Sequence, residues 1–262
     1  MAESAEPLRD ERPSGPCLQT FFRNHEVISQ TLRSACLARP RRLRILTVGG
    51  GVLEPLLVAA LCELFHDAGQ LDDYEITCLD LSADVAEIHD HLRAGRAYQD
   101  RGHQVVSADG RLSLPGLARV FSATHAEVNS WLIDPVALSG QLQEWIDLGV
   151  ARYLGIPPDI CHSTERMVRF VAEGFDVPRR LVDGLRTVCG DVGSPDPPPV
   201  AAGWADVVVS NYALQYPIWA GNGELALRNL ESWLAPDANG QIGHPYTAQG
   251  HLLALVDPVG PR

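Results

Sequence analysis

Apolar positions along the chain follow two patterns: short continuous runs bounded by turn residues, and longer stretches that repeat every three to four residues. The first pattern is typical of buried strands and the second of helices. Strands are predicted at 43–48, 74–79, 185–189, 205–210 and 251–256. Helices are predicted at 18–37, 54–66, 84–92 and 224–234. Strands that alternate with helices indicate a parallel α/β sheet, in which ligands bind at the carboxyl ends of the strands.

The alternation stops between residues 95 and 180, where the pattern is helical in pieces. The pieces lie at 114–131, 136–148 and 164–173. A block of this length is too long for an ordinary connection, so we predict a helical lid or substrate insertion between the second and third strands. The expected organisation is a leader and helix over 1–43, followed by an α/β domain over 44–262 that the insertion 95–180 interrupts.

Composition removes several classes of function. The chain has 21 basic and 33 acidic residues, and every basic residue is arginine. Without lysine it cannot form a Schiff base with pyridoxal phosphate or place a P-loop lysine over a nucleotide. The net charge of −12 argues against a general nucleic-acid partner, although a local basic strip stays open. The polar segment 1–16 has no apolar signal core, and no stretch reaches the about 18 apolar residues of a membrane span, so we expect a cytoplasmic protein with no membrane partner.

The nine histidines and six cysteines show no metal-binding spacing. His89 and His91 are two residues apart and lie on different faces of a helix, and neither HxxxH nor HExxH occurs. His162 in the insertion is a candidate general base that nothing in the sequence selects. The cysteines form no CxxC pair and stand mostly in apolar runs. We therefore expect reduced, buried thiols and no metal.

A glycine turn joins the first strand to its helix. Gly49, Gly50 and Gly51 let the backbone approach a bound group closely and leave helix amides free. The spacing is not GxGxxG, because Leu53 takes the third glycine's place, and this disfavours a dinucleotide pyrophosphate. Glu54 stands beside the turn, where a carboxylate repels phosphate and attracts an ammonium group. A turn needed only for packing is the alternative.

Two acids follow later strands. Asp80 ends the second strand, where a carboxylate can accept hydrogen bonds from both ribose hydroxyls. The alternative, a helix N-cap, already has a candidate in Ser82. Asp191 follows the third strand, where an adenine amino group could donate to it, although aspartate is also an ordinary turn residue. Leu81 and Val192, the next residues along the chain, are expected in the same binding site.

These three features in this order indicate an adenosine that carries an amino acid, which is S-adenosyl-L-methionine (SAM). At 20–23 the chain reads Thr-Phe-Phe-Arg, and at 48–55 the glycine turn ends in Glu-Pro. Residues 78–82 read Cys-Leu-Asp-Leu-Ser, and residues 210–216 read Ser-Asn-Tyr-Ala-Leu-Gln-Tyr. The chain thus resembles the class I SAM-dependent methyltransferases, and more narrowly the chemotaxis-receptor branch. The last segment is also similar to the Q-F-A-L-H-Y motif of RNA cap guanine-N7 methyltransferases.

The resemblance implies a Rossmann-like sheet and a set of roles. Arg23 would lie near the SAM carboxylate and the acceptor, Glu54 would bind the amino group, and Asp80 would bind the ribose. Tyr212 and Tyr216 would line the reacting side, where an aromatic face also stabilises sulfonium charge. The candidate catalytic residues are Arg23, Asn211, Tyr212 and Tyr216. The asparagine among them would accept from the SAM amino group or orient the acceptor.

Three functions stay open. The first is methyl transfer to a small molecule of the secondary-metabolite type, because the long insertion and the short N-terminal segment differ from the receptor enzymes. The second is cyclisation of SAM to a small-ring amino acid, or transfer of its aminocarboxypropyl arm, with release of methylthioadenosine. The third is a non-catalytic SAM-binding subunit. SAM is the only cofactor expected, and a homodimer partner could complete a sheet that stops at its fifth strand.

Overall fold

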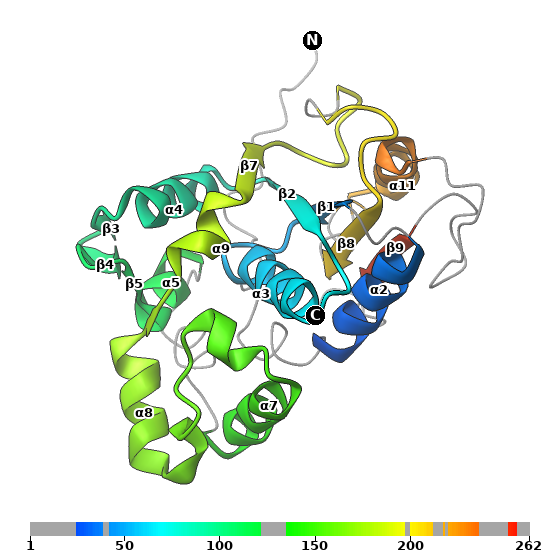
Figure 1. Ribbon diagram of the computed structural model, residues 1–262. Helices are drawn as coiled ribbons and strands as arrows, with labels where there is room; N and C mark the ends of the chain where they lie inside the picture. The colour runs from blue at the N-terminus through cyan, green and yellow to red at the C-terminus, as the bar shows by residue number, and fades with distance from the viewer. Residues whose placement is uncertain are drawn as a thin grey trace.

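The computed structural model describes residues 25–38, 42–121, 135–196, 200–211, 217, 220–235 and 251–255. At its centre lies a five-stranded sheet of order β7-β2-β1-β8-β9, in which every neighbouring pair is parallel (Figure 1). The strands are β1 (Arg42–Val48), β2 (Asp73–Asp80), β7 (Leu185–Cys189), β8 (Val207–Asn211) and β9 (His251–Leu255). The strands are added first on one side of β1 and then on the other, which is the order of a doubly wound sheet. The predicted Rossmann-like α/β class is confirmed.

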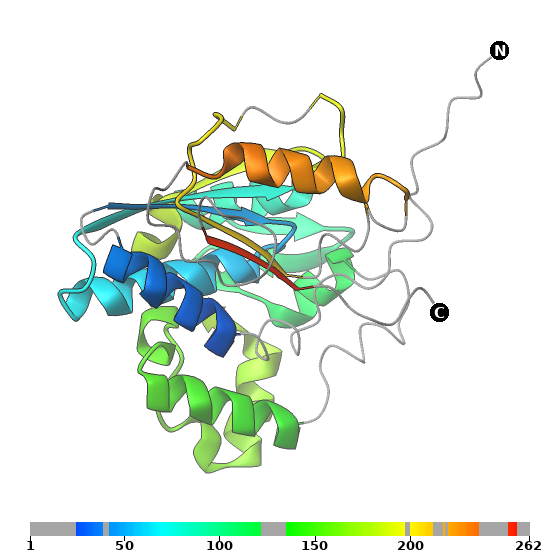
Figure 2. The ribbon, with the colours of Figure 1, turned by 90° about the vertical axis from the view of Figure 1, so that its right-hand side faces the viewer.

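Helices cover both faces of the sheet. Figure 2 shows α11 (Gly223–Trp233) on one side and α2 (His25–Ala38) with α3 (Leu53–Asp67) on the other. The alternation of side chains along β1 explains this, since Ile45 packs in the core on the α3 side and Leu46 in the core on the α11 side. The helix α4 (Ala83–Ala94) shares the α3 side. These helices lie within one or two residues of their predicted bounds, except that 18–24 of the first falls outside the described residues.

The insertion is not purely helical, and that prediction was wrong in one respect. Its helical segments are α5 (Leu114–Phe121), α7 (Pro135–Leu148), η1 (Ala151–Leu154), η2 (Ile160–His162), α8 (Thr164–Glu173) and α9 (Arg179–Asp183). A second, antiparallel sheet joins β3 (Tyr98–Asp100), β4 (His103–Val106), β5 (Arg111–Leu112) and β6 (Phe175–Asp176). Strands of two to four residues are too short to show an alternating pattern, so the hydrophobic pattern does not predict them. Residues 122–131, the rest of the first predicted helix, lie outside the described residues.

One cluster anchors the insertion to the carboxyl-terminal half of α3. The Tyr153 hydroxyl donates to the Asp67 carboxylate at 2.5 Å. The guanidinium carbons of Arg152 and Arg180 lie 4.6 and 5.3 Å from the centre of the Tyr153 ring, and Arg180 also pairs with Glu63 at 3.6 Å. Cation–π attraction and charge pairing therefore hold the insertion at the end of α3 opposite the glycine turn. Whether the insertion also covers a ligand stays a prediction.

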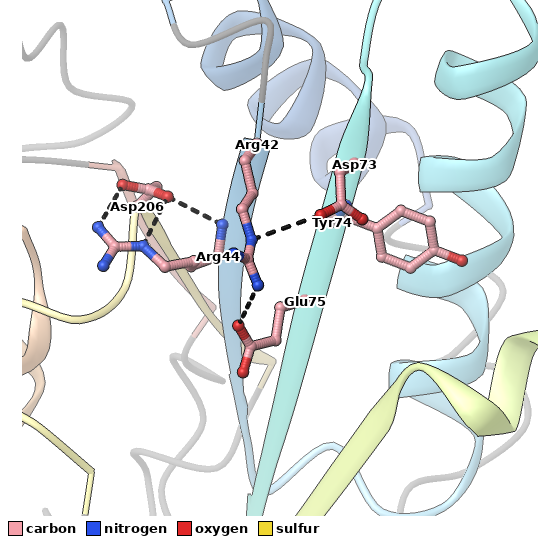
Figure 3. A network of polar contacts seen from close by, with 6 residues as sticks. All are labelled: Arg42, Arg44, Asp73, Tyr74, Glu75 and Asp206. Atoms are coloured by element: carbon pink, nitrogen blue, oxygen red, sulfur yellow. Dashed lines mark hydrogen bonds and ion pairs between the residues drawn. The ribbon is translucent and has the colours of Figure 1, made fainter.

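Two arginines from the basic run 39–44 are paired at the amino edge of the sheet (Figure 3). Asp206, whose side chain is only 4% exposed, accepts from the backbone N–H of Arg44 at 2.8 Å and from its Nη2 at 3.2 Å. Arg42 pairs with Glu75 at 3.0 Å and with Asp73 at 3.5 Å. These cations are already neutralised within the sheet. The part of this run that the structure describes offers no unpaired strip for a phosphate backbone.

No helix among the described residues is both long and apolar enough to cross a membrane.

Candidate functional site

The loops after β1, β2 and β7 meet at the carboxyl edge of the sheet. The backbone N–H of Gly49 donates to the Leu79 carbonyl at 2.8 Å, which joins the glycine turn to the end of β2. The N–H of Gly190 donates to the Asp80 carbonyl at 2.8 Å, which joins the loop after β7 to the same strand end. The structure therefore brings together the glycine turn, Asp80 and the segment of Asp191, as the sequence predicts.

Asp80 is half-buried and connects the first two loops through its side chain. Its Oδ2 accepts from the Gly51 N–H at 3.0 Å, and its Oδ1 accepts from the Ser82 N–H at 2.9 Å. Ser82 is the N-cap residue of α4 but makes no capping hydrogen bond with its own side chain. A carboxylate has about four acceptor positions, and the sequence assigns the ribose hydroxyls to this one. That role stays a prediction.

The three glycines of the turn are required for two different reasons. Gly49 and Gly51 have φ values of 66° and 61°, a left-handed backbone that side chains disfavour. At Gly50 the reason is space, because a Cβ there would lie 2.5 Å from Oε1 of Glu54. The carboxylate of Glu54 therefore folds back against the turn.

Glu54 lies in the first turn of α3 and is only 4% exposed. The positive end of the helix dipole favours a negative charge at this position. Its charge, with that of Asp80, also reaches the thiol of Cys78 beneath the turn. Burial, followed by these two carboxylates, raises the pKa of Cys78 well above its ordinary value, while a hydrogen bond with Thr47 opposes the shift. Two carboxylates, those of Glu54 and Asp80, thus lie close to the turn, an arrangement that suits a bound ammonium group better than a phosphate.

His89, to which the sequence assigned no role, holds the turn from below. It is fully buried on α4, with Nε2 3.1 Å from the Val52 carbonyl and Nδ1 2.9 Å from the Thr187 hydroxyl. A carbonyl only accepts, so Nε2 carries the proton and Nδ1 accepts from Thr187. Burial lowers the pKa of His89 to about 4, and the ring is neutral at neutral pH. The available signal was its place on the apolar face of the helix, one residue after the buried Ile88.

The loop after β7 is held by its own aspartate and by α11. Oδ1 of Asp191 accepts from the Gly193 N–H at 2.7 Å, which forms a tight turn. From α11, Nδ2 of Asn229 donates to the carbonyls of Val192 at 2.8 Å and Ser194 at 3.0 Å. The Val192 side chain is buried in the core on the α11 side, so it supports the loop from within.

Leu81 and Cys189 are both accessible at this edge. Leu81 is 63% exposed, so its side chain is accessible for contact with a flat ring. The thiol of the exposed Cys189 donates to the Leu81 carbonyl at 3.4 Å. The expectation that the cysteines are buried was therefore wrong for Cys189, because it ends β7 at the open edge of the sheet.

The reacting side of the predicted site is largely outside the described residues. Arg23, Tyr212 and Tyr216 are all outside the described residues, and their roles stay predictions. Asn211 ends β8, which pairs with β1 and β9, and its backbone therefore reaches the same edge. Within the described part of the chain, no three His, Cys, Asp or Glu side chains are grouped so that they could hold a metal ion.

A cavity of about 240 Å³ opens elsewhere, in the insertion between η2, α8 and β5. Most of its charged lining residues pair with one another, and the remaining one, Arg169, pairs with Glu165 outside the lining. Arg111 lies 3.2 Å from Asp176 and 3.7 Å from Glu173, and Arg166 pairs with Asp159. The charges in this lining are balanced, so the cavity has no clear preference for an anion or a cation.

No family model and no curated protein matches the chain. One similar solved structure is that of a protein from Methanococcus maripaludis provisionally described as a SAM-dependent methyltransferase. The two chains share 12% identity with a TM-score of 0.33, over 90% of this chain and 64% of the other. This chain thus spans less than two thirds of that protein's length. The function of the present chain is therefore inferred from the chain's own residues.

Proposed function

We propose that the protein binds SAM at the carboxyl edge of its sheet and transfers the methyl group to a small-molecule acceptor. The observation that carries this proposal is the contact between the Gly51 N–H and Oδ2 of Asp80. It joins a glycine turn that lacks the dinucleotide spacing to an acid at the end of the neighbouring strand. A nucleoside that carries an amino acid fits this pair of features better than a diphosphate does.

Three parts of the proposed ligand, the ammonium group, the ribose and the adenine ring, have a matching group at this edge. The amino-acid end would lie over the glycine turn, where Glu54 supplies negative charge for the ammonium group. The ribose hydroxyls would bind Asp80. The adenine ring would lie against the exposed Leu81, with its amino group toward Asp191. The residues present therefore fit SAM in charge and in order along the sheet.

Bound SAM supplies an electrophilic methyl group on a sulfonium, and the sulfur keeps the electron pair when the methyl leaves. The protein's own task is mainly to hold the acceptor in line with the methyl group and to exclude water. Tyr212 and Tyr216 are proposed to line this reacting side and to stabilise the positive sulfur by cation–π attraction. Arg23 and Asn211 are proposed to orient the acceptor and the amino-acid end of SAM.

Calorimetry with the wild type and two variants tests the binding site. We expect Asp80→Ala to abolish measurable SAM binding without changing the fold. Asp73→Ala is the matched control, since Asp73 lies on the same strand at the opposite edge, where it is exposed and paired with Arg42. If Asp80→Ala binds SAM as tightly as Asp73→Ala, the proposed ribose site is wrong.

Product analysis tests the reaction. The purified protein is incubated with SAM alone and then with SAM and a cell extract, and the nucleoside products are identified by mass spectrometry. S-adenosylhomocysteine that forms only with extract, and in excess of what the extract forms without the protein, supports methyl transfer. Methylthioadenosine from SAM alone would contradict it and indicate cyclisation. SAM binding without any nucleoside product would indicate a non-catalytic subunit.

A further inference from the structure

One side chain from the far face of the sheet fixes the loop that follows β7. Asn229 lies on α11, is only 8% exposed, and donates from one nitrogen to two carbonyls of that loop. The two acceptors, Val192 and Ser194, are 2.8 and 3.0 Å from Nδ2. Asp191, the proposed partner of the adenine amino group, stands directly before this pair. The amide of Asn229 thus determines the path of the chain on which Asp191 stands.

The chemistry of this contact is specific to an amide. Two carbonyl oxygens converge on one atom, which must present two N–H groups at once, and only the amide nitrogen of asparagine does so at this length. Aspartate has the same shape but only accepts when ionised, so it would set a carboxylate against two carbonyl oxygens. A buried acceptor without a donor is costly, and the loop would have to move away.

The loop has little room to move without losing its shape. Oδ1 of Asp191 already accepts from the Gly193 N–H, and the Ser194 N–H donates to the Asp191 carbonyl at 3.2 Å. A Cβ added to Gly193 would lie 3.1 Å from Cβ of Pro217 and 3.5 Å from Cβ of Asn222. The loop is therefore packed between its own turn and the segment before α11. A change at Asn229 acts on Asp191 through this packed turn.

We propose that Asn229 is a positioning residue that sets the selectivity of the site for the adenine ring. It touches no ligand itself and acts through the loop that holds Asp191. This inference rests on the proposed function, because it assumes that the nucleoside of SAM binds at this edge. It adds that the base is recognised only when the amide holds the loop in place.

The test compares two nucleoside ligands across three proteins. Calorimetry measures the affinity of wild type, Asn229→Asp and Asn229→Ala for S-adenosylhomocysteine and for its deaminated analogue, S-inosylhomocysteine, which lacks the amino group. We expect the wild type to bind the adenosyl ligand more tightly than the inosyl ligand. In both variants the ratio of the two affinities should fall about tenfold. Arg228→Ala is the control, since Arg228 is an exposed neighbour on the same helix and the preference should stay unchanged.

A purely structural role predicts a different result. The Asn229 variants would then have a lower melting temperature and would bind both ligands more weakly by the same factor, so the preference would stay as in the wild type. That outcome overturns the inference. The double variant Asn229→Ala/Asp191→Asn gives a second check. If Asn229 acts through Asp191, adding Asn229→Ala to Asp191→Asn reduces the preference no further, and an additive loss contradicts the proposal.

The experiment also separates this inference from the function on which it rests. If the wild type binds both ligands and the variants keep its preference, only the positioning role fails. If the wild type binds neither ligand, the proposed SAM site fails and the inference fails with it. If Asn229→Asp does not fold, Asn229→Ala, which adds no charge, decides the outcome.

Discussion

The buried imidazole of His89 makes the stability of the protein depend on pH. In the folded protein burial lowers the pKa of His89 from 6.5 to about 4. One pKa unit corresponds to about 1.4 kcal/mol, so this gap makes up to about 3 kcal/mol of folding free energy pH-dependent. Desolvation is the main cause, and the charges of Arg93 and Asp90 act in opposite directions on it.

The sign follows from which state binds the proton. Above pH 6.5 the ring of His89 is neutral in both states, and its contribution is complete. Between about 6.5 and 4 the unfolded chain binds a proton that the folded protein excludes, so the free energy of unfolding falls as the pH falls. Below about pH 4 both states bind the proton, and the loss is complete. The most sensitive window is therefore between pH 6.5 and 4.

Urea unfolding at several pH values between 7 and 4 measures this effect. The wild type is compared with His89→Gln, whose amide nitrogen can replace Nε2 as donor to the Val52 carbonyl but does not titrate. We expect the variant to be less stable at pH 7 and to lose about 3 kcal/mol less than the wild type on acidification. His91→Gln, two residues along the same helix, controls for a general loss of histidine. Equal losses in wild type and His89→Gln would refute the reasoning, as would an NMR pKa of His89 near 6.5.

Three further predictions concern other parts of the structure. Asp206→Ala should lower the free energy of unfolding by about 2 kcal/mol, because it leaves the Arg44 amide and guanidinium without their buried acceptor. Asp73→Ala removes an exposed ion pair and should lower it by less than about 0.5 kcal/mol, so equal effects of the two variants in urea unfolding would contradict this prediction. Glu54→Gln should weaken the binding of SAM more than the binding of an analogue that lacks the amino group. Equal losses of affinity in calorimetry would show that Glu54 does not bind the amino-acid end. Cys189 should react with iodoacetamide much faster than buried Cys62, and saturating SAM should slow it; mass spectrometry that finds no protection would place the adenosine elsewhere.

The main sheet and its loops could be predicted from the sequence because their signals are local. The strands of the main sheet are marked by short apolar runs, such as Val207–Val209 in β8, and the carboxyl ends of parallel neighbours must meet at one edge. The contacts of Asp80 with Gly51 and Gly190 are the direct result. The antiparallel sheet of the insertion could not be predicted, because β5 and β6 have two residues each and pair across a long stretch of chain.

His89 and Asn229 were missed for a different reason. Their partners are distant in sequence, so no spacing rule connects them to a loop. Both nevertheless leave a local signal, because each is a polar residue on the buried face of an amphipathic helix. His89 follows the buried Ile88, and Asn229 precedes the buried Leu230. A polar side chain at such a position must find a buried partner, and in a doubly wound fold the nearest backbone groups that lack a partner lie in the loops at the sheet edge.

These contacts form one connected network around the proposed site. Asn229 holds the loop after β7, the first residue of that loop donates to the Asp80 carbonyl, and the Asp80 carboxylate holds the glycine turn. His89 then links the end of that turn back to Thr187 on β7. Both loops are fixed by buried and partly buried hydrogen bonds within the protein itself, so a ligand that binds between them has little ordering cost to overcome. Removing either His89 or Asn229 should therefore weaken binding by loosening a loop, although neither side chain is proposed to touch the ligand itself.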